Sequence, residues 1–187
     1  MASNTTGANN TAVGFTALLT NTTGADNVAV GLAAMEVNTT GSDNTALGRS
    51  ALAANTTASN NIAIGRNALL ANTTGEINTA IGSQSMLTNT TGYGNTAVGR
   101  NSLYTNNGNN NTAFGHEALE LNTSGANNVA IGRQALEANT TADNNIAVGI
   151  AALTTNTTGA QNVSIGSASL EVSTTASNNT AVGFKSL

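Results

Sequence analysis

A glycine recurs at an almost fixed interval and divides the chain into copies of one short unit. The glycines stand at positions 14, 31, 48, 65, 82 and 99, at steps of 17 residues, then at 115 after one step of 16, and then at 132, 149, 166 and 183 with the step of 17 restored. Such self-similarity is typical of a repeat protein. Because repeats grow by stacking, we expect residues 1–187 to form one continuous domain.

The residues before each of these glycines predict a short strand. In Asn61-Ile62-Ala63-Ile64, as in the other units, β-branched or apolar residues alternate with a small one. Alternation at period two is typical of strands. A unit of 17 residues is also too short for a helical-hairpin repeat. The expected fold class is therefore all-β, a parallel β-solenoid (β-roll) with 17-residue coils and about eleven repeats.

Two columns of large apolar residues are the predicted core, a column being the set of residues at the same place in every unit. The pre-glycine column directly precedes the glycine, and the Leu/Met column follows it by four places. Their members, in chain order, are Val13, Leu18, Val30, Met35, Leu47, Leu52, Ile64, Leu69, Ile81, Met86, Val98, Leu103, Phe114, Leu119, Ile131, Leu136, Val148, Leu153, Ile165, Leu170 and Val182.

Two columns of Asn are predicted to form ladders. The first Asn column stands four places before the glycine: Asn10, Asn27, Asn44, Asn61, Asn78, Asn95, Asn111, Asn128, Asn145, Asn162 and Asn179. The second opens the Asn-Thr-Thr-Gly turn and is formally a row of glycosylation acceptors: Asn21, Asn38, Asn55, Asn72, Asn89, Asn122, Asn139 and Asn156. Glycans about 4.8 Å apart would collide. Amide ladders between stacked coils are the preferred interpretation.

Composition excludes several classes of function. Charged residues make up 7% of the chain and aromatic residues 3%, and there is no Cys and a single His. A His-based metal cluster, a Cys/His pair or a zinc ribbon cannot be built from this inventory. A net charge of −4 argues against nucleic acid as a partner. We therefore expect a non-enzyme with no catalytic, cofactor-binding or metal-ligating residues, no cofactor and no membrane insertion in this segment.

Charged side chains follow two columns. Arg49, Arg66, Arg100, Arg133 and His116 come directly after the glycine. They form either a groove for an acidic ligand or a solvated edge that deters aggregation. The solvated edge is the preferred interpretation, because residues without charge interrupt the column. The glutamates Glu36, Glu120, Glu137 and Glu171 share another column, which is read as a surface stripe.

One coil is irregular. Between Gly99 and Gly115 the segment 106–111 replaces the usual Asn-Thr-Thr-Gly turn with one residue fewer, and Tyr93 and Tyr104 lie close to it in sequence. The irregularity is either a binding spot or a neutral deletion in a loop. The neutral deletion is the preferred reading.

The units 61–69 and 128–136, which read Asn-Ile-Ala-Ile-Gly-Arg-Asn-Ala-Leu and Asn-Val-Ala-Ile-Gly-Arg-Gln-Ala-Leu, resemble the Ala-Ile-Gly-x-x-Ala repeats of trimeric autotransporter adhesin heads and related bacterial surface or phage tail-fibre proteins. The resemblance implies a left-handed β-roll, three chains around an axis and an extracellular place on a bacterial surface or virion fibre. It also implies a structural and adhesive role, with a host, prey or matrix surface as ligand. Those head repeats are shorter, and the excess here is the Asn-Thr-Thr-Gly turn. Since the chain starts and stops inside a unit, we expect a fragment of a longer array.

Ice binding is the alternative function, because Thr-rich solenoids with little charge can present regular Thr arrays. Neighbouring Thr residues of one turn, such as Thr39 and Thr40, point to opposite faces, so at most one of each pair faces outward. A further column mixes Thr11, Thr45, Thr79 and Thr96 with Val28, Ile62, Val129 and Ile146. Its exchange of Thr for apolar residues predicts that it is buried, which leaves a single outward rank of Thr.

Overall fold

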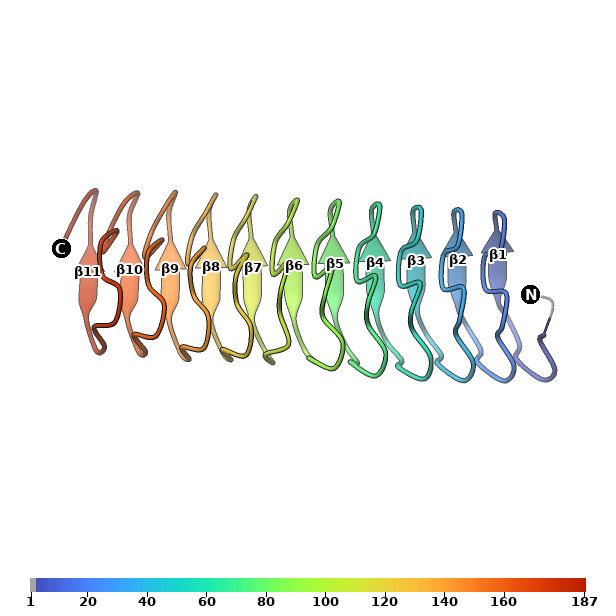
Figure 1. Cartoon of the computed structure of the whole chain (residues 1–187). Helices are drawn as coiled ribbons and strands as arrows, with labels where there is room; N and C mark the ends of the chain where they lie inside the picture. Colours follow the sequence, from blue (N-terminus) through green and yellow to red (C-terminus); the bar gives the residue numbers. More distant parts are fainter. Residues whose placement is uncertain (1–2) are drawn as a thin grey trace.

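The computed structural model describes residues 3–187, in which eleven three-residue strands follow one another along the chain. The strands stand in one row with the chain termini at opposite ends (Figure 1). Their bounds are β1 Thr11–Val13, β2 Val28–Val30, β3 Thr45–Leu47, β4 Ile62–Ile64, β5 Thr79–Ile81, β6 Thr96–Val98, β7 Thr112–Phe114, β8 Val129–Ile131, β9 Ile146–Val148, β10 Val163–Ile165 and β11 Thr180–Val182.

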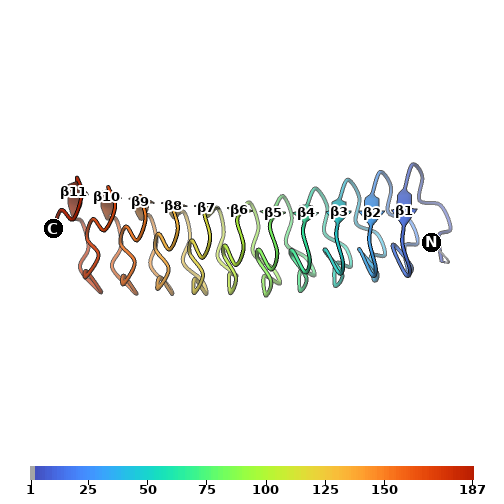
Figure 2. The ribbon, with the colours of Figure 1, turned by 90° about the horizontal axis from the view of Figure 1, so that it is seen from above.

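These strands form one parallel sheet in sequence order, with each coil stacked on the next (Figure 2). The register pairs the same positions of neighbouring repeats: Thr45 pairs with Ile62, Ala46 with Ala63 and Leu47 with Ile64. This is the parallel β-solenoid expected from the repeat. The described residues contain no helix with the length and hydropathy needed to cross a bilayer.

The glycine that marks each coil is required by its positive φ angle and by the close approach of the next coil's backbone. Gly48 has a φ of 134°, outside the region open to other L-residues. A Cβ on Gly48 would also lie 2.7 Å from the carbonyl oxygen of Gly65 in the next coil. The close approach of neighbouring backbones at this bend explains why the unit keeps a glycine at every copy.

The Leu/Met column is the core, as predicted. Its members from Leu18 to Leu170 are buried, and they pack with Ala residues from the strand centres and from the place just before each Leu. Each core Leu or Met holds a left-handed backbone, for example φ 53° at Leu52. That conformation costs roughly 1–2 kcal/mol for an L-residue. Complete burial of a Leu side chain, at about 1.5–3 kcal/mol, offsets this cost in every coil.

The pre-glycine column is not core, so that half of the prediction is wrong. No member is buried; the residues concerned are Val13, Val30, Leu47, Ile64, Ile81, Val98, Phe114, Ile131, Val148, Ile165 and Val182. In a three-residue strand the central side chain points one way and its two neighbours the other. The central Ala faces inward, as with the fully buried Ala46, and packs in one buried cluster with the Leu/Met column. The large apolar residue therefore faces outward.

Both Asn columns form ladders inside the stack, as predicted. The backbone N–H and the Nδ2 of Asn44 donate to Oδ1 of Asn27 at 3.0 and 3.1 Å. In the second column, Nδ2 of Asn55 donates to Oδ1 of Asn38 at 2.8 Å. The two ladders meet because Asn44 and Asn55 both donate to the carbonyl of Ala58, at 2.9 and 3.0 Å. One half of the interior is thus apolar and the other half is a hydrogen-bonded amide network.

Candidate functional site

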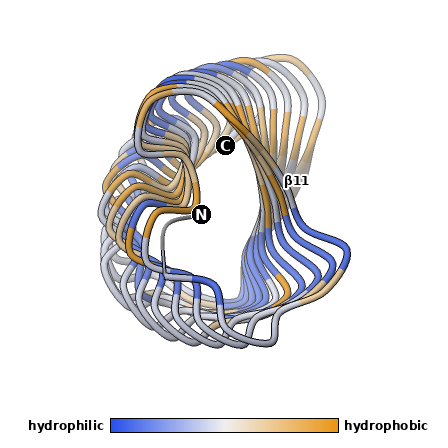
Figure 3. Ribbon diagram, turned by 90° about the vertical axis from the view of Figure 1, so that its right-hand side faces the viewer, coloured by the Kyte–Doolittle hydropathy of each residue, from blue (hydrophilic) through white to orange (hydrophobic). Residues whose placement is uncertain are grey.

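An extended surface feature is the outward side of the sheet, here called the sheet face. It consists of two ranks, the pre-glycine column and the strand-start column, which is Thr11, Val28, Thr45, Ile62, Thr79, Thr96, Thr112, Val129, Ile146, Val163 and Thr180. The prediction that the strand-start column is buried is wrong, since all its members are exposed or half-buried. Figure 3, which looks along the stack, shows apolar residues along this side and polar residues at a neighbouring corner.

The sheet face is large, uncharged and mainly apolar, with six Thr among its residues. Phe114 is 56% exposed and Leu47 46%, and neither rank contains an ionisable residue. Eleven strands about 4.8 Å apart and three residues wide span roughly 50 by 10 Å. Contiguous apolar surfaces of several hundred Å² on soluble proteins mark interaction sites. The geometry therefore makes this face the best candidate for a functional surface.

The face is bordered by two rims of different chemical character. The amide rim, five places before each glycine, carries Asn9, Asp26, Asp43, Asn60, Ile77, Gly94, Asn110, Asn127, Asn144, Gln161 and Asn178. The basic rim, one place after the glycine, carries Phe15, Leu32, Arg49, Arg66, Ser83, Arg100, His116, Arg133, Ile150, Ser167 and Phe184. Its four arginines are exposed, and no pocket opens on residues 3–187. The exposure of the arginines and the lack of a pocket in the described residues favour the solvated edge over a groove for an acidic ligand.

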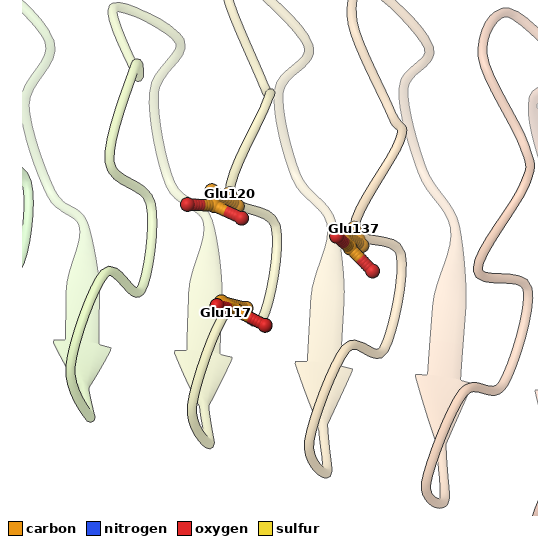
Figure 4. A group of neighbouring side chains, drawn as sticks. All are labelled: Glu117, Glu120 and Glu137. Atoms are coloured by element: carbon orange, nitrogen blue, oxygen red, sulfur yellow. The ribbon is translucent and has the colours of Figure 1, made fainter.

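Three glutamates form the acidic cluster, the only group of its kind found in residues 3–187 (Figure 4). Carboxylate oxygens of Glu117, Glu120 and Glu137 lie within 4.8 Å of one another. Glu120 and Glu137 belong to the predicted glutamate stripe, but Glu117 comes from another column and joins them because both columns lie on the same bend. Column alignment alone could not reveal this meeting, since it requires the path of the bend.

The surroundings of the acidic cluster set its electrostatics. Partial burial raises the pKa of Glu120, and the neighbouring charges of Glu117 and Glu137 raise it further. Asn101 Nδ2 donates to Glu120 at 3.2 Å, and Gln134 Nε2 donates to Glu117 at 3.1 Å. Carboxylate oxygens suit a hard cation such as Ca²⁺, which takes six to eight oxygen ligands. Three half-buried carboxylates supply part of such a set.

The irregular coil keeps the stack continuous. β6 and β7 pair in full register across the deletion, with Val98 opposite Phe114. Oδ1 of Asn107 accepts hydrogen bonds from the Thr90 N–H at 2.8 Å, the Thr90 hydroxyl at 2.9 Å and the Thr91 N–H at 3.3 Å. In regular coils a Thr carbonyl accepts the equivalent bonds. The Asn107 side chain thus takes the acceptor role that the Thr carbonyl has in regular coils, which supports the interpretation of a tolerated deletion.

The two Thr residues of each turn have different surroundings, as expected. The hydroxyl of Thr39 donates to the carbonyl of Thr56 in the next coil at 2.9 Å. Thr40 is exposed. The second Thr of each turn is exposed, whereas the first is half-buried in most coils and helps to hold neighbouring coils together.

Comparison of the chain with protein-family models, with curated proteins and with solved structures gave no match.

Proposed function

We propose that the chain is a structural and adhesive repeat segment of an extracellular fibre, on a bacterial surface or a virion. It works through length, rigidity and a repeated surface, and it performs no catalysis. Copies of the chain associate with one another, and the resemblance to adhesin heads implies three chains. A host, prey or matrix surface is the ligand of the fibre.

The observation that carries this proposal is the unbroken register of the sheet over eleven coils. Every neighbouring pair of strands aligns the same three positions of the repeat, including the pair at the irregular coil. In a solenoid each repeat contacts only its neighbours, so adding coils adds length without changing the cross-section. Such a design suits a spacer that also displays one surface many times.

Small-angle X-ray scattering and sedimentation velocity of the purified chain test the proposal. Eleven coils about 4.8 Å apart predict a rod roughly 50 Å long for one copy, with no shortening on dilution. A compact sphere would contradict the fibre role. A variant lacking residues 62–78, one repeat of 17, is the control and should shorten the rod by about 4.8 Å while keeping the fold.

Ice binding is a second candidate, favoured by the outward position of the strand-start column. Six of its eleven members are Thr, at positions 11, 45, 79, 96, 112 and 180, on a face without charge. Thermal hysteresis and ice-crystal shaping test this function directly. Clear hysteresis at sub-millimolar concentration, lost in a Thr79→Lys/Thr96→Lys variant, would make ice binding the primary function in place of the fibre role.

A further inference from the structure

We propose that the sheet face is the docking surface for a second copy of this chain, with the two solenoids side by side, parallel, and related by a two-fold axis along the stack. The inference deepens the proposed function, because it names the surface and the partner through which a fibre would be assembled. It replaces the three chains implied by the resemblance with two.

The sizes of the residues in the two ranks favour this arrangement. A two-fold axis along the stack sets each strand opposite the same strand of the second copy, with the pre-glycine rank facing the strand-start rank. Phe114, the bulkiest residue of the face, then meets Thr112, and Leu47 meets Thr45. Cores pack best when large residues face small ones. An antiparallel pair would instead set each rank against itself and press Phe114 against Ile81.

The rims favour the same arrangement. In the parallel pair the amide rim of one copy meets the basic rim of the other, so Asp43 lies opposite Arg49 at both edges of the interface. The amide rim contains no basic residue and the basic rim no acidic one. In the antiparallel pair Arg66 would face Arg133, and Arg100 would face itself. Like charges in opposition oppose association, whereas complementary rims steer it.

The area of the face is sufficient for one partner of this kind. A surface of roughly 50 by 10 Å on each copy gives roughly 1,000 Å² in total, which reaches the lower limit for a specific interface. The estimate leaves out the rims, which add polar contacts around the apolar centre. A partner with the same strand spacing can keep its side chains in step along all eleven strands, and a second copy meets this condition. Once it is covered, so narrow a face has no room for a third chain.

Cross-linking in the whole chain tests both the surface and the orientation. The protein has no Cys, so single Cys variants report one site each. Packed sheets lie about 10 Å apart, too far for a disulfide, so a short bifunctional maleimide is the probe. Val13→Cys in β1 and Val182→Cys in β11 should each give a covalent dimer with its own kind. Thr40→Cys, exposed on the turn, is the matched control and should not.

Other outcomes overturn the inference. If neither variant cross-links alone but an equal mixture of the two does, the pair is antiparallel. A three-chain assembly in sedimentation overturns the two-fold pairing, and a rod that stays monomeric and uncross-linked overturns the docking surface while leaving the fibre role intact. A compact particle in scattering is a failure of the fibre role and not of the interface.

Two substitutions separate the interface from the fold. Leu47→Lys should weaken dimerisation by at least about tenfold, because a charge would be buried without a partner, and should leave the monomer's circular dichroism unchanged. Asp43→Arg should weaken dimerisation by a few-fold, and the double variant Asp43→Arg/Arg49→Asp should restore it. A double variant no better than the single one would contradict the parallel pairing of the rims.

Discussion

Leu47 and Leu52 are the same residue type five places apart in one coil, yet they lie on opposite sides of the solenoid wall. Leu47 ends β3 and is 46% exposed, whereas Leu52 is fully buried. Both belong to columns of large apolar residues that recur in every unit. The difference shows that in a closed coil the direction of a side chain is set by the path of the backbone. Hydrophobicity alone does not decide it.

The same comparison separates two roles that apolar residues play here. The inward Leu/Met column, with its Asn ladders, holds the coils together. The outward pre-glycine column leaves a surface that a second copy can cover. Substitutions on the two sides should therefore affect different measurements.

The largest expected effect separates Leu52 from Leu47 directly. Leu52→Ala should lower the free energy of unfolding by about 2–5 kcal/mol, because it removes a fully buried side chain and leaves a cavity. Leu47→Ala should change the stability of the monomer by less than about 1 kcal/mol. Chemical denaturation at a concentration where the protein is monomeric measures both. Equal losses for the two variants would contradict the assignment of inside and outside.

The polar half of the interior offers the next comparison, between Asn55 and Thr57 of one turn. Asn55→Ala removes bonds to Asn38 and Ala58 and leaves buried polar groups unsatisfied, which should cost about 2–3 kcal/mol. Thr57 is exposed, so Thr57→Ala should be nearly neutral. Thermal melts of the two variants give the result. A silent Asn55→Ala would show that the ladder contributes little to stability.

The second Asn ladder ends where Ser173 takes the place of an Asn, and this end can be extended. Asn156 Oδ1 and Ser173 Oγ are both buried without a hydrogen-bond partner within residues 3–187. Ser173→Asn should supply an Nδ2 donor to Asn156 and raise the free energy of unfolding by about 1 kcal/mol. Hydrogen exchange at the C-terminal coils should slow accordingly. Thr175→Asn, at an exposed position of the same turn, is the control and should not have this effect.

The smallest expected effect concerns the half-buried carboxylate of Glu120. The folded state raises the pKa of this carboxyl above its ordinary value of 4.5 and so binds its proton more tightly than the unfolded chain. Stability therefore falls as the pH rises from about 4.5 through the folded pKa. Glu120→Gln should raise the melting temperature slightly at pH 7 and leave it unchanged near pH 3. Glu36→Gln, at a position with no glutamate in the neighbouring coils of its column, is the matched control.

The sequence predicted the solenoid, the strands, the Leu/Met core and both Asn ladders, because each of these depends on which residues recur at a fixed spacing. The prediction of which strand side chains face inward was wrong. The pattern Thr-Ala-Leu of residues 45–47 says that Ala46 and Leu47 face opposite ways, but it does not say which one faces inward. That choice depends on which side of the strand faces Leu52, which is set by the path of the closed coil.

The acidic cluster and the Asn107 replacement were missed for a related reason. Glu117 meets Glu137 only because the bend after the glycine brings two columns together. Asn107 accepts the hydrogen bonds of Thr90 only because the chain is one residue shorter at that turn. The acidic cluster is a contact between columns, which alignment within a column cannot detect. Asn107 and Thr90 share a column, but alignment does not show that a side-chain oxygen takes the place of a main-chain carbonyl.

The most direct measurement of the central claim is the rate of thiol labelling at two positions of one coil. Leu47→Cys and Leu52→Cys are made separately in a chain that has no other Cys, and maleimide labelling is followed in native buffer at a concentration where the protein is monomeric. We predict that the Leu47→Cys variant reacts at nearly the rate of an unfolded control, and that the Leu52→Cys variant is strongly protected until the protein unfolds. Protection at 47 together with rapid labelling at 52 would contradict the account.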